Sequence, residues 1–313
     1  RGNCKTALYQ VPQWLKRFFI WGRLMSALSF TCAAEQAFPE RRMPMSTTWN
    51  LWHGCTKVSA GCQHCYVYRR DAEFGKDSSI VTKTKAFDLP IRKDRKGEYK
   101  VKPEDGVVYT CFTSDFFHPD ADEWRKDAWS MMRTRADLDF FFVTKRPERF
   151  HVNLPEDWGE GYPNVHICCT CENQYMADKR LPVFLELPVR HKSIIHEPML
   201  GPIHIERFLE KYGEEIDQVI CGGESGDEAR LCDYAWVMDT MCQCVKYEVP
   251  FHFKQTGANF KRGDQIYHIP RKDQQIQAAK AKIDYMPQAR FRKELYENEE
   301  PRYPDLYQLS LPL

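Results

Sequence analysis

The sequence predicts an α/β protein with a parallel β-sheet, and three observations support this class. Six short apolar runs rich in β-branched and aromatic residues recur along the chain. Each run is followed by polar or turn residues and then by a helical pattern. The runs are nearly continuous in apolar residues, as is typical of strands buried on both faces. A (β/α) barrel, full or partial, and an open doubly wound sheet both fit this order.

The predicted elements alternate along the chain. Strands are expected at 107–112, 140–144, 165–169, 192–196, 218–221 and 250–254. Helices are expected at 122–136, 173–187, 204–212, 233–247 and 271–284. The first helix carries an apolar face formed by Trp124, Ala128, Trp129 and Met132. We expect Gly213 to end the third helix, Asp233 to cap the fourth, and Pro182 to restart a helix rather than lie inside one.

Composition sets limits on the class of protein. The chain has 313 residues, a formal net charge of +1 and 42% hydrophobic residues. These values exclude disordered, collagen-like and coiled-coil proteins, and they argue against a chain that binds polyanions over its whole surface. The 13 cysteines are an odd, clustered number. They are typical of reduced thiols in the cytoplasm, with a subset that binds metal or acts in catalysis.

The chain divides into three predicted parts. Residues 1–44 form an N-terminal extension that we expect to lie outside the fold, as translated upstream sequence or a remnant of cloning. Their basic and apolar pattern also resembles a secretory signal, although an oxidising compartment would pair the cysteines. No apolar run reaches the ~18 residues of a membrane-spanning helix. The main domain is expected at 45–285, and residues 286–313 form a tail.

The clearest chemical motif is a cluster of three cysteines in one loop near the start of the main domain. Cys55, Cys62 and Cys65 have the spacing C-x6-C-x2-C. Three thiolates from one loop can hold an iron–sulfur cluster or another soft metal centre. A structural zinc ion would need a fourth ligand, such as His53, His64 or one of Cys168, Cys169 and Cys171. Iron–sulfur, zinc and unliganded thiols all remain compatible with this spacing.

Polar residues follow each predicted strand, where the active sites of parallel α/β proteins lie. The candidates at these strand ends are Ser114, Asp115, Lys145, Glu172, Asn173, Glu197, Gly222, Gly223 and Glu224. The paired glycines allow a close approach of the backbone to a ligand or a tight turn.

Seven ordered segments resemble a phage-associated three-Cys-motif family of radical-SAM-like proteins. They are 49–66, 114–118, 144–149, 172–174, 197–203, 222–226 and 253–255, and the resemblance spans residues 46–270. The barrel of that family is similar to that of spore photoproduct lyase. The resemblance implies a partial (β/α) barrel of about six to seven parallel strands. The first cysteine gap of six residues departs from the usual radical-SAM spacing of three.

The resemblance also implies a function. Three thiolates leave one iron of a [4Fe–4S] cluster open, S-adenosyl-L-methionine (SAM) binds there, and its reductive cleavage yields a 5′-deoxyadenosyl radical. Cys55, Cys62 and Cys65 would bind the cluster. Ser114 and Asp115 would hold the methionine amino group, and Lys145, Glu172 and Asn173 would reach the carboxylate and the ribose. Gly222 and Gly223 would also bind the cofactor. Glu197 and Glu224 would face the substrate. A flavodoxin or ferredoxin would supply electrons.

The substrate is the least constrained prediction. Residues 83–102 form an insertion with eight Lys or Arg and three Asp or Glu, a local charge of +5. Next to the site, such a segment could attract a nucleic acid or a nucleotide, although a solvated surface loop has the same composition. The alternative function is a zinc-stabilised nucleic-acid-binding module without catalysis. Cys168, Cys169 and Cys171 provide either a second thiol site or small core residues.

Overall fold

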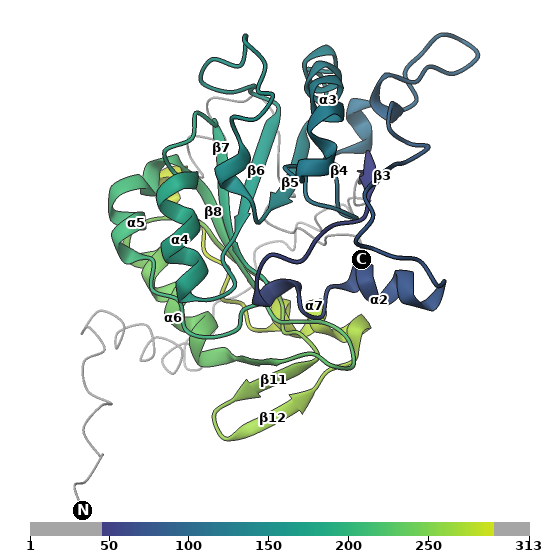
Figure 1. The fold of residues 1–313 in the computed structure, drawn as a ribbon. Helices are drawn as coiled ribbons and strands as arrows, with labels where there is room; N and C mark the ends of the chain where they lie inside the picture. Colours follow the sequence, from purple (N-terminus) through teal and green to yellow (C-terminus); the bar gives the residue numbers. More distant parts are fainter. Residues whose placement is uncertain (1–45, 291–313) are drawn as a thin grey trace, which may run out of the picture. The chain divides into compact units, whose positions relative to one another are not determined.

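Seven parallel strands form the central sheet (Figure 1). The structure is a computed structural model and describes residues 46–290. In spatial order the strands are β1 (Thr47–Trp49), β4 (Val108–Thr110), β5 (Phe140–Thr144), β6 (Val165–Thr170), β7 (His191–His196), β8 (Ile216–Gly222) and β10 (Phe251–Gln255). The predicted extension at 1–44 and the tail beyond residue 290 lie outside the described residues.

The order of the strands identifies the architecture. Neighbours in the sheet follow one another along the chain, and all six pairings are parallel. A doubly wound sheet would reverse its strand order at a switch point, whereas a barrel winds in one direction. The sheet is therefore a partial (β/α) barrel, as predicted, and all six predicted strands are present within two residues of their expected ends.

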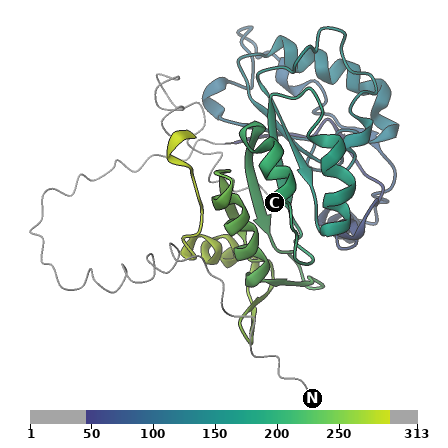
Figure 2. The ribbon, with the colours of Figure 1, turned by 90° about the vertical axis from the view of Figure 1, so that its left-hand side faces the viewer.

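Helices cover the outer face of the sheet (Figures 1 and 2). They are α3 (Asp122–Thr134), α4 (Gln174–Phe184), α5 (Glu206–Tyr212) and α6 (Tyr234–Lys246), while α2 (Tyr66–Glu73) follows the cysteine loop and α7 (Arg271–Lys280) contacts β10.

Asp233 accepts a hydrogen bond from the Ala235 N–H and caps α6, as predicted. The prediction for Pro182 is wrong, because it lies inside α4. The helix ends two residues later, so the missing N–H affects only its last turn.

The two faces of the sheet carry separate apolar clusters. The large outer cluster joins alternate strand residues such as Phe140, Phe142 and Ile167 to the helices. The small inner cluster consists of Tyr109, Phe141, Cys168, Ile195 and Ile220 with Val107, Phe112 and Val143 beside it. Burial on both faces explains why the strands have nearly continuous apolar sequences.

Shorter elements complete the domain. A three-stranded sheet contains β9 (Leu231–Asp233), β11 (Asn259–Arg262) and β12 (Gln265–His268), and β2 (Trp52–His53) pairs with β3 (Thr82–Lys83). The 3-10 helices are Ala60–Cys62, Leu89–Ile91, Pro103–Asp105, Pro119–Ala121, Pro147–Arg149 and Gly213–Glu215. Between residues 46 and 290, no helix has the length and apolar character needed to cross a membrane.

Candidate functional site

The cysteine loop and the carboxyl ends of the strands enclose a cavity of about 210 Å³. One wall runs from Cys55 to Arg69 and includes all three clustered cysteines. The facing wall comes from strand ends: Ser114, Asp115, Lys145, Arg146, Thr170, Glu197, Gly223, Glu224, Lys254 and Gln255. Its floor includes Val143 and Ile195 from the inner apolar cluster. The chain thus brings the predicted cysteines and most of the predicted strand-end residues to one place.

The backbone of the cysteine loop is fixed at several points. Gly54 has a φ of +97°, and a Cβ there would overlap the carbonyl oxygen of Ile80, so only glycine fits. The Cys55 N–H donates to the Ser78 carbonyl at 2.7 Å. Cys62 closes a 3-10 turn, and Cys65 is the N-cap residue of α2.

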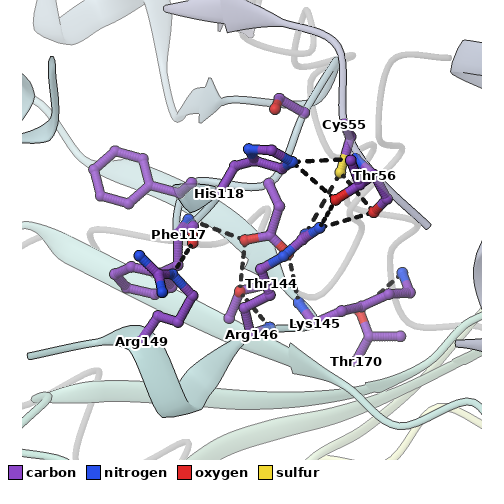
Figure 3. Close-up of polar contacts among 12 residues, drawn as sticks. Cys55, Thr56, Phe117, His118, Thr144, Lys145, Arg146, Arg149 and Thr170 are labelled. Carbon is purple, nitrogen blue, oxygen red and sulfur yellow. Dashed lines mark hydrogen bonds and ion pairs between the residues drawn. The ribbon is translucent and has the colours of Figure 1, made fainter. Parts of the chain in front are cut away.

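Arg146 connects the cysteine loop to the sheet (Figure 3). Its Nη1 lies 3.5 Å from Cys55 Sγ and 3.1 Å from Asp115 Oδ2, and its Nη2 donates to the Thr56 carbonyl at 2.7 Å. Burial raises the pKa of the Cys55 thiol to about 11, the charge of Asp115 adds to this rise, and Arg146 opposes it. Cys55 is therefore protonated at neutral pH in the absence of a ligand, and a metal ion would have to displace the proton.

Asp115 and Ser114 line the cavity but have partners within the protein. Asp115 Oδ1 accepts from Phe117 N–H and Thr144 Oγ1, while Oδ2 accepts from Lys145 N–H at 2.9 Å. Burial would raise the pKa of Asp115, yet Arg146 and these hydrogen bonds lower it below its ordinary value. Ser114 Oγ donates to the carbonyl of Gly54. Both side chains therefore hold the cysteine loop and the strand ends together.

Glu172 and Asn173 are not brought into the cavity wall. Glu172 is fully buried; its Oε1 accepts from Gly61 N–H at 3.1 Å and its Oε2 from Arg180 Nη1 at 2.7 Å. Burial would raise the pKa of Glu172, but Arg180 lowers it. Asn173 caps α4 by accepting from Met176 N–H. Glu172 thus positions the cysteine loop from behind, because Gly61 directly precedes Cys62.

Two cations line the cavity without an ion pair to any carboxylate of residues 46–290. Lys145 Nζ lies 3.5 Å from Thr170 Oγ1. Arg69, one turn into α2, has a buried Nε with no hydrogen-bond partner among the described atoms. The guanidinium lies against Gly226, where a Cβ would overlap Nη1. These two groups are positive charges in the cavity wall with which an anion can pair.

The carboxylates of the cavity are paired. Glu197 accepts from Lys254 Nζ at 2.7 Å and 2.9 Å and from Gln255 Nε2 at 2.6 Å. Glu224 accepts from Arg230 Nε at 2.8 Å, and this arginine lowers the carboxyl pKa that burial would raise. Both groups line the cavity as charged acceptors. Gly223 lines it as well, whereas Gly222 lies behind Glu197, whose side chain is 3.1 Å from a Cβ built at that glycine.

Within residues 46–290, only His166, His191 and Asp217 place three His, Cys, Asp or Glu ligand atoms all within 4.8 Å of one another. The three loop sulfurs do not meet this condition, whereas thiolates on one tetrahedral zinc ion lie roughly 3.8 Å apart. The proposed fourth zinc ligands have other partners. His53 Nε2 is 2.7 Å from Asp71 Oδ2, and His64 Nδ1 is 3.2 Å from Glu228 Oε2.

The basic insertion does not lie beside the cavity as expected, because none of residues 83–102 lines it. Trp49 Nε1 donates to the carbonyls of Ala86 and Phe87, so the insertion covers the edge strand β1. Arg135, which lies between α3 and β5, donates to the carbonyls of Pro90 and Val101 in the insertion. Figure 1 shows this segment beside α3, away from α2.

Sequence reasoning assigned no role to three Lys or Arg residues of the cavity wall, Arg69, Arg146 and Lys254. Arg146 and Lys254 lie in segments that the resemblance included, but no role was predicted for them. Arg69 lies four residues after Cys65, on the same side of α2, and this helical spacing was the available signal.

Comparison with known proteins gives one match. The sequence model of a family described as "Protein of unknown function (DUF5131)" matches residues 44–293. No curated protein and no solved structure matches the chain. The matched range contains every residue of the cavity wall.

Proposed function

The chain belongs to the DUF5131 family, whose description assigns no activity, and from the site itself we propose that it is a radical SAM enzyme. The main support is that three free thiols line one wall of a cavity, and that the carboxyl ends of the strands of a partial (β/α) barrel form the other wall. Active sites of such barrels lie at this edge. The resemblance to the phage-associated three-Cys-motif family supports the same proposal.

The donor set fits a [4Fe–4S] cluster. Cys55, Cys62 and Cys65 would hold it, and because each thiolate binds a different iron, their sulfurs need not converge within the radius of one ion. When bound, the cluster and SAM supply reductive carbon–sulfur cleavage and a carbon radical. The protein holds the loop through Arg146 and Glu172 and excludes water with the apolar floor of the cavity.

The charges of the cavity suit SAM and an anionic substrate. Lys145 is suited to the carboxylate of the methionine part, because it lines the cavity and forms no ion pair with a carboxylate of residues 46–290. Glu197 and Glu224 are already paired with Lys254 and Arg230, so they would accept hydrogen bonds rather than remove protons. Arg69 then remains for a second anion. A phosphate group is the natural partner of a guanidinium, which supports a nucleotide or nucleic-acid substrate.

The proposed chemistry favours a reducing compartment. The eleven cysteines between residues 46 and 290 are all free thiols, as expected for a cytoplasmic enzyme. A low-potential donor of the flavodoxin or ferredoxin type would supply the electron.

Anaerobic reconstitution with iron and sulfide tests the proposal. We expect a brown protein that releases 5′-deoxyadenosine when SAM and a strong reductant are added. Lys145→Gln should retain iron and sulfide while weakening SAM binding, and Lys126→Gln, on the exposed face of α3, should match the wild type. A colourless protein that binds zinc and no sulfide would overturn the proposal and favour the non-catalytic module.

Addition of oligonucleotides and nucleotides tests the substrate class. We expect one of them to be modified, or to bind with an affinity that Arg69→Gln reduces at least tenfold. Equal affinity of the wild type and Arg69→Gln for every phosphate-bearing compound would contradict an anionic substrate.

A further inference from the structure

The amino end of the same sheet carries a second group of metal-ligand side chains. His166 is the second residue of β6, His191 begins β7 and Asp217 is the second residue of β8. Asp217 Oδ2 is 3.4 Å from His191 Nδ1 and 3.9 Å from His166 Nδ1. The two imidazole rings are stacked, with centroids 4.1 Å apart. Three possible donor atoms from three adjacent strands therefore lie within 4.8 Å of one another.

Strand register explains why these residues meet. His166 and His191 are direct partners in the parallel ladder between β6 and β7, so their side chains leave the sheet on the same face. Between β7 and β8 the register shifts, because Lys192 pairs with Ile216 while Ser193 pairs with Gln218. Asp217 is the extra residue of this bulge. A bulge redirects a side chain, and bulges are common next to functional sites.

The distances fit ligands of one ion better than hydrogen bonds. N–H···O bonds span about 2.7–3.2 Å, shorter than both separations of Asp217 from the imidazole nitrogens. Ligands at 2.0–2.1 Å from a tetrahedral zinc ion are roughly 3.4 Å apart. Two imidazole nitrogens and one carboxylate oxygen are a donor set for zinc and other divalent transition metals.

We propose that His166, His191 and Asp217 form a mononuclear site for a divalent transition metal of the zinc type. Three protein ligands leave one coordination position open for water or another small ligand. The ion would connect β6, β7 and β8 at their amino ends. Burial differs among the ligands: the side chain of His166 is 6% exposed, whereas those of His191 and Asp217 are 32% and 36% exposed, which provides access for the metal.

The site is separate from the cysteine cavity. Alternate residues of a strand share a face, so His166 lies on the same side of β6 as Cys168 and Thr170. Thr170 lines the cavity, and Cys168 belongs to the inner apolar cluster between the two ends. The proposal therefore holds or fails independently of the radical SAM assignment.

Titration of the full, untagged and metal-free chain with Co²⁺ and Zn²⁺ tests the proposal. Cobalt bound by imidazole and carboxylate shows visible d–d bands without thiolate-to-metal charge transfer, which distinguishes this site from the cysteine loop. We expect one such equivalent in the wild type. His191→Gln and Asp217→Asn, both at partly exposed positions, should lose it while keeping any thiolate-bound metal.

The matched control is His252→Gln. His252 Nδ1 lies 3.0 Å from Asp284 Oδ2 in a pair without a second histidine, so this variant should bind the full equivalent. Zinc competition should then remove the cobalt signal. Absence of a thiolate-free equivalent from the wild type would overturn the proposal, as would its persistence in His191→Gln and Asp217→Asn or its equal loss in His252→Gln.

Discussion

Cysteines in the loop and cysteines in the strands of this protein have the same side chain but different surroundings. Cys55, Cys62 and Cys65 are partly exposed and line the cavity. Cys168, Cys169, Cys171 and Cys221 are fully buried in the apolar clusters. Burial raises the pKa of the Cys168, Cys171 and Cys221 thiols well above the ordinary value. Backbone position, rather than residue type, decides which thiols are available to a metal.

Cys168, Cys169 and Cys171 also do not meet at one site, although Cys169 and Cys171 contact each other. Cys168 belongs to the inner cluster, whereas Cys169 and Cys171 belong to the outer one. Successive residues of a strand point to opposite faces, so these three sulfurs cannot form one site. Sequence analysis left two interpretations of these cysteines, a second thiol site and small core residues. The structure supports small core residues.

The largest expected effect comes from single replacements in the loop. Cys55→Ala, Cys62→Ala and Cys65→Ala should each abolish stable iron and sulfide binding and SAM cleavage, because two thiolates cannot hold the cluster in place. Iron and sulfide analysis after anaerobic reconstitution measures this loss. Cys242→Ala is the control, since Cys242 is exposed on α6. A loop variant that keeps the iron content of the wild type would show that this loop cysteine is not a ligand, and would contradict the distinction between loop and strand cysteines.

The second prediction concerns the alkylation rate of Cys55 in the metal-free protein, which at pH 8 should be about a thousandfold below the rate of the fully ionised thiol. With its pKa raised to about 11 by burial, a fraction of roughly 10⁻³ of this thiol is ionised at pH 8. Only the thiolate reacts with iodoacetamide, so the alkylation rate should rise about tenfold per pH unit up to pH 11. Mass spectrometry of the Cys55 peptide gives the profile, with glutathione as a reference. A plateau near pH 9 would contradict the raised pKa of this thiol.

Strand positions could be predicted from sequence because burial on both faces leaves a continuous apolar signal. β5, for example, has the predicted bounds 140–144. The small sheet of β9, β11 and β12 was missed, since all four residues of β12 are exposed and carry no such signal. Pro182 was misplaced because the sequence does not show that α4 ends two residues later.

The residues of the candidate site likewise fall into those that the sequence could predict and those that it could not. Strand-end residues could be predicted from topology alone, which is why Lys145, Glu197 and Glu224 reach the cavity. Whether a strand-end side chain faces the cavity depends on its partners, and Arg180 and Gly61 turn Glu172 away from it. The His166–His191–Asp217 group depends on a register shift between two strands, and no local sequence pattern encodes that shift.

A third prediction concerns Asp115, which joins the loop to the sheet. Asp115→Asn should lower the free energy of unfolding at pH 7 by about 3 kcal/mol, because it leaves the Arg146 guanidinium buried without its counter-charge. Urea denaturation measures this difference. Asp127→Asn, at an exposed site on α3, should change stability by less than about 0.5 kcal/mol.

The same pair gives a pH dependence. The folded pKa of Asp115 is lowered below 3.8, so its contribution is complete above that value and is lost as the pH falls through the folded pKa. The difference between wild type and Asp115→Asn should therefore shrink below about pH 4. A difference that stays constant down to pH 2 would show that Asp115 does not act through its charge.

The smallest effect tests the strand cysteines as packing residues. Cys169→Ala removes one buried sulfur from the outer cluster and should cost about 1 kcal/mol of unfolding free energy, measured in urea. Iron and sulfide content should match the wild type, because Cys169 lies on the opposite face of β6 from the cavity-lining Thr170. Loss of iron with unchanged stability would reverse the argument: it would make this thiol a ligand and leave burial unable to distinguish the two groups.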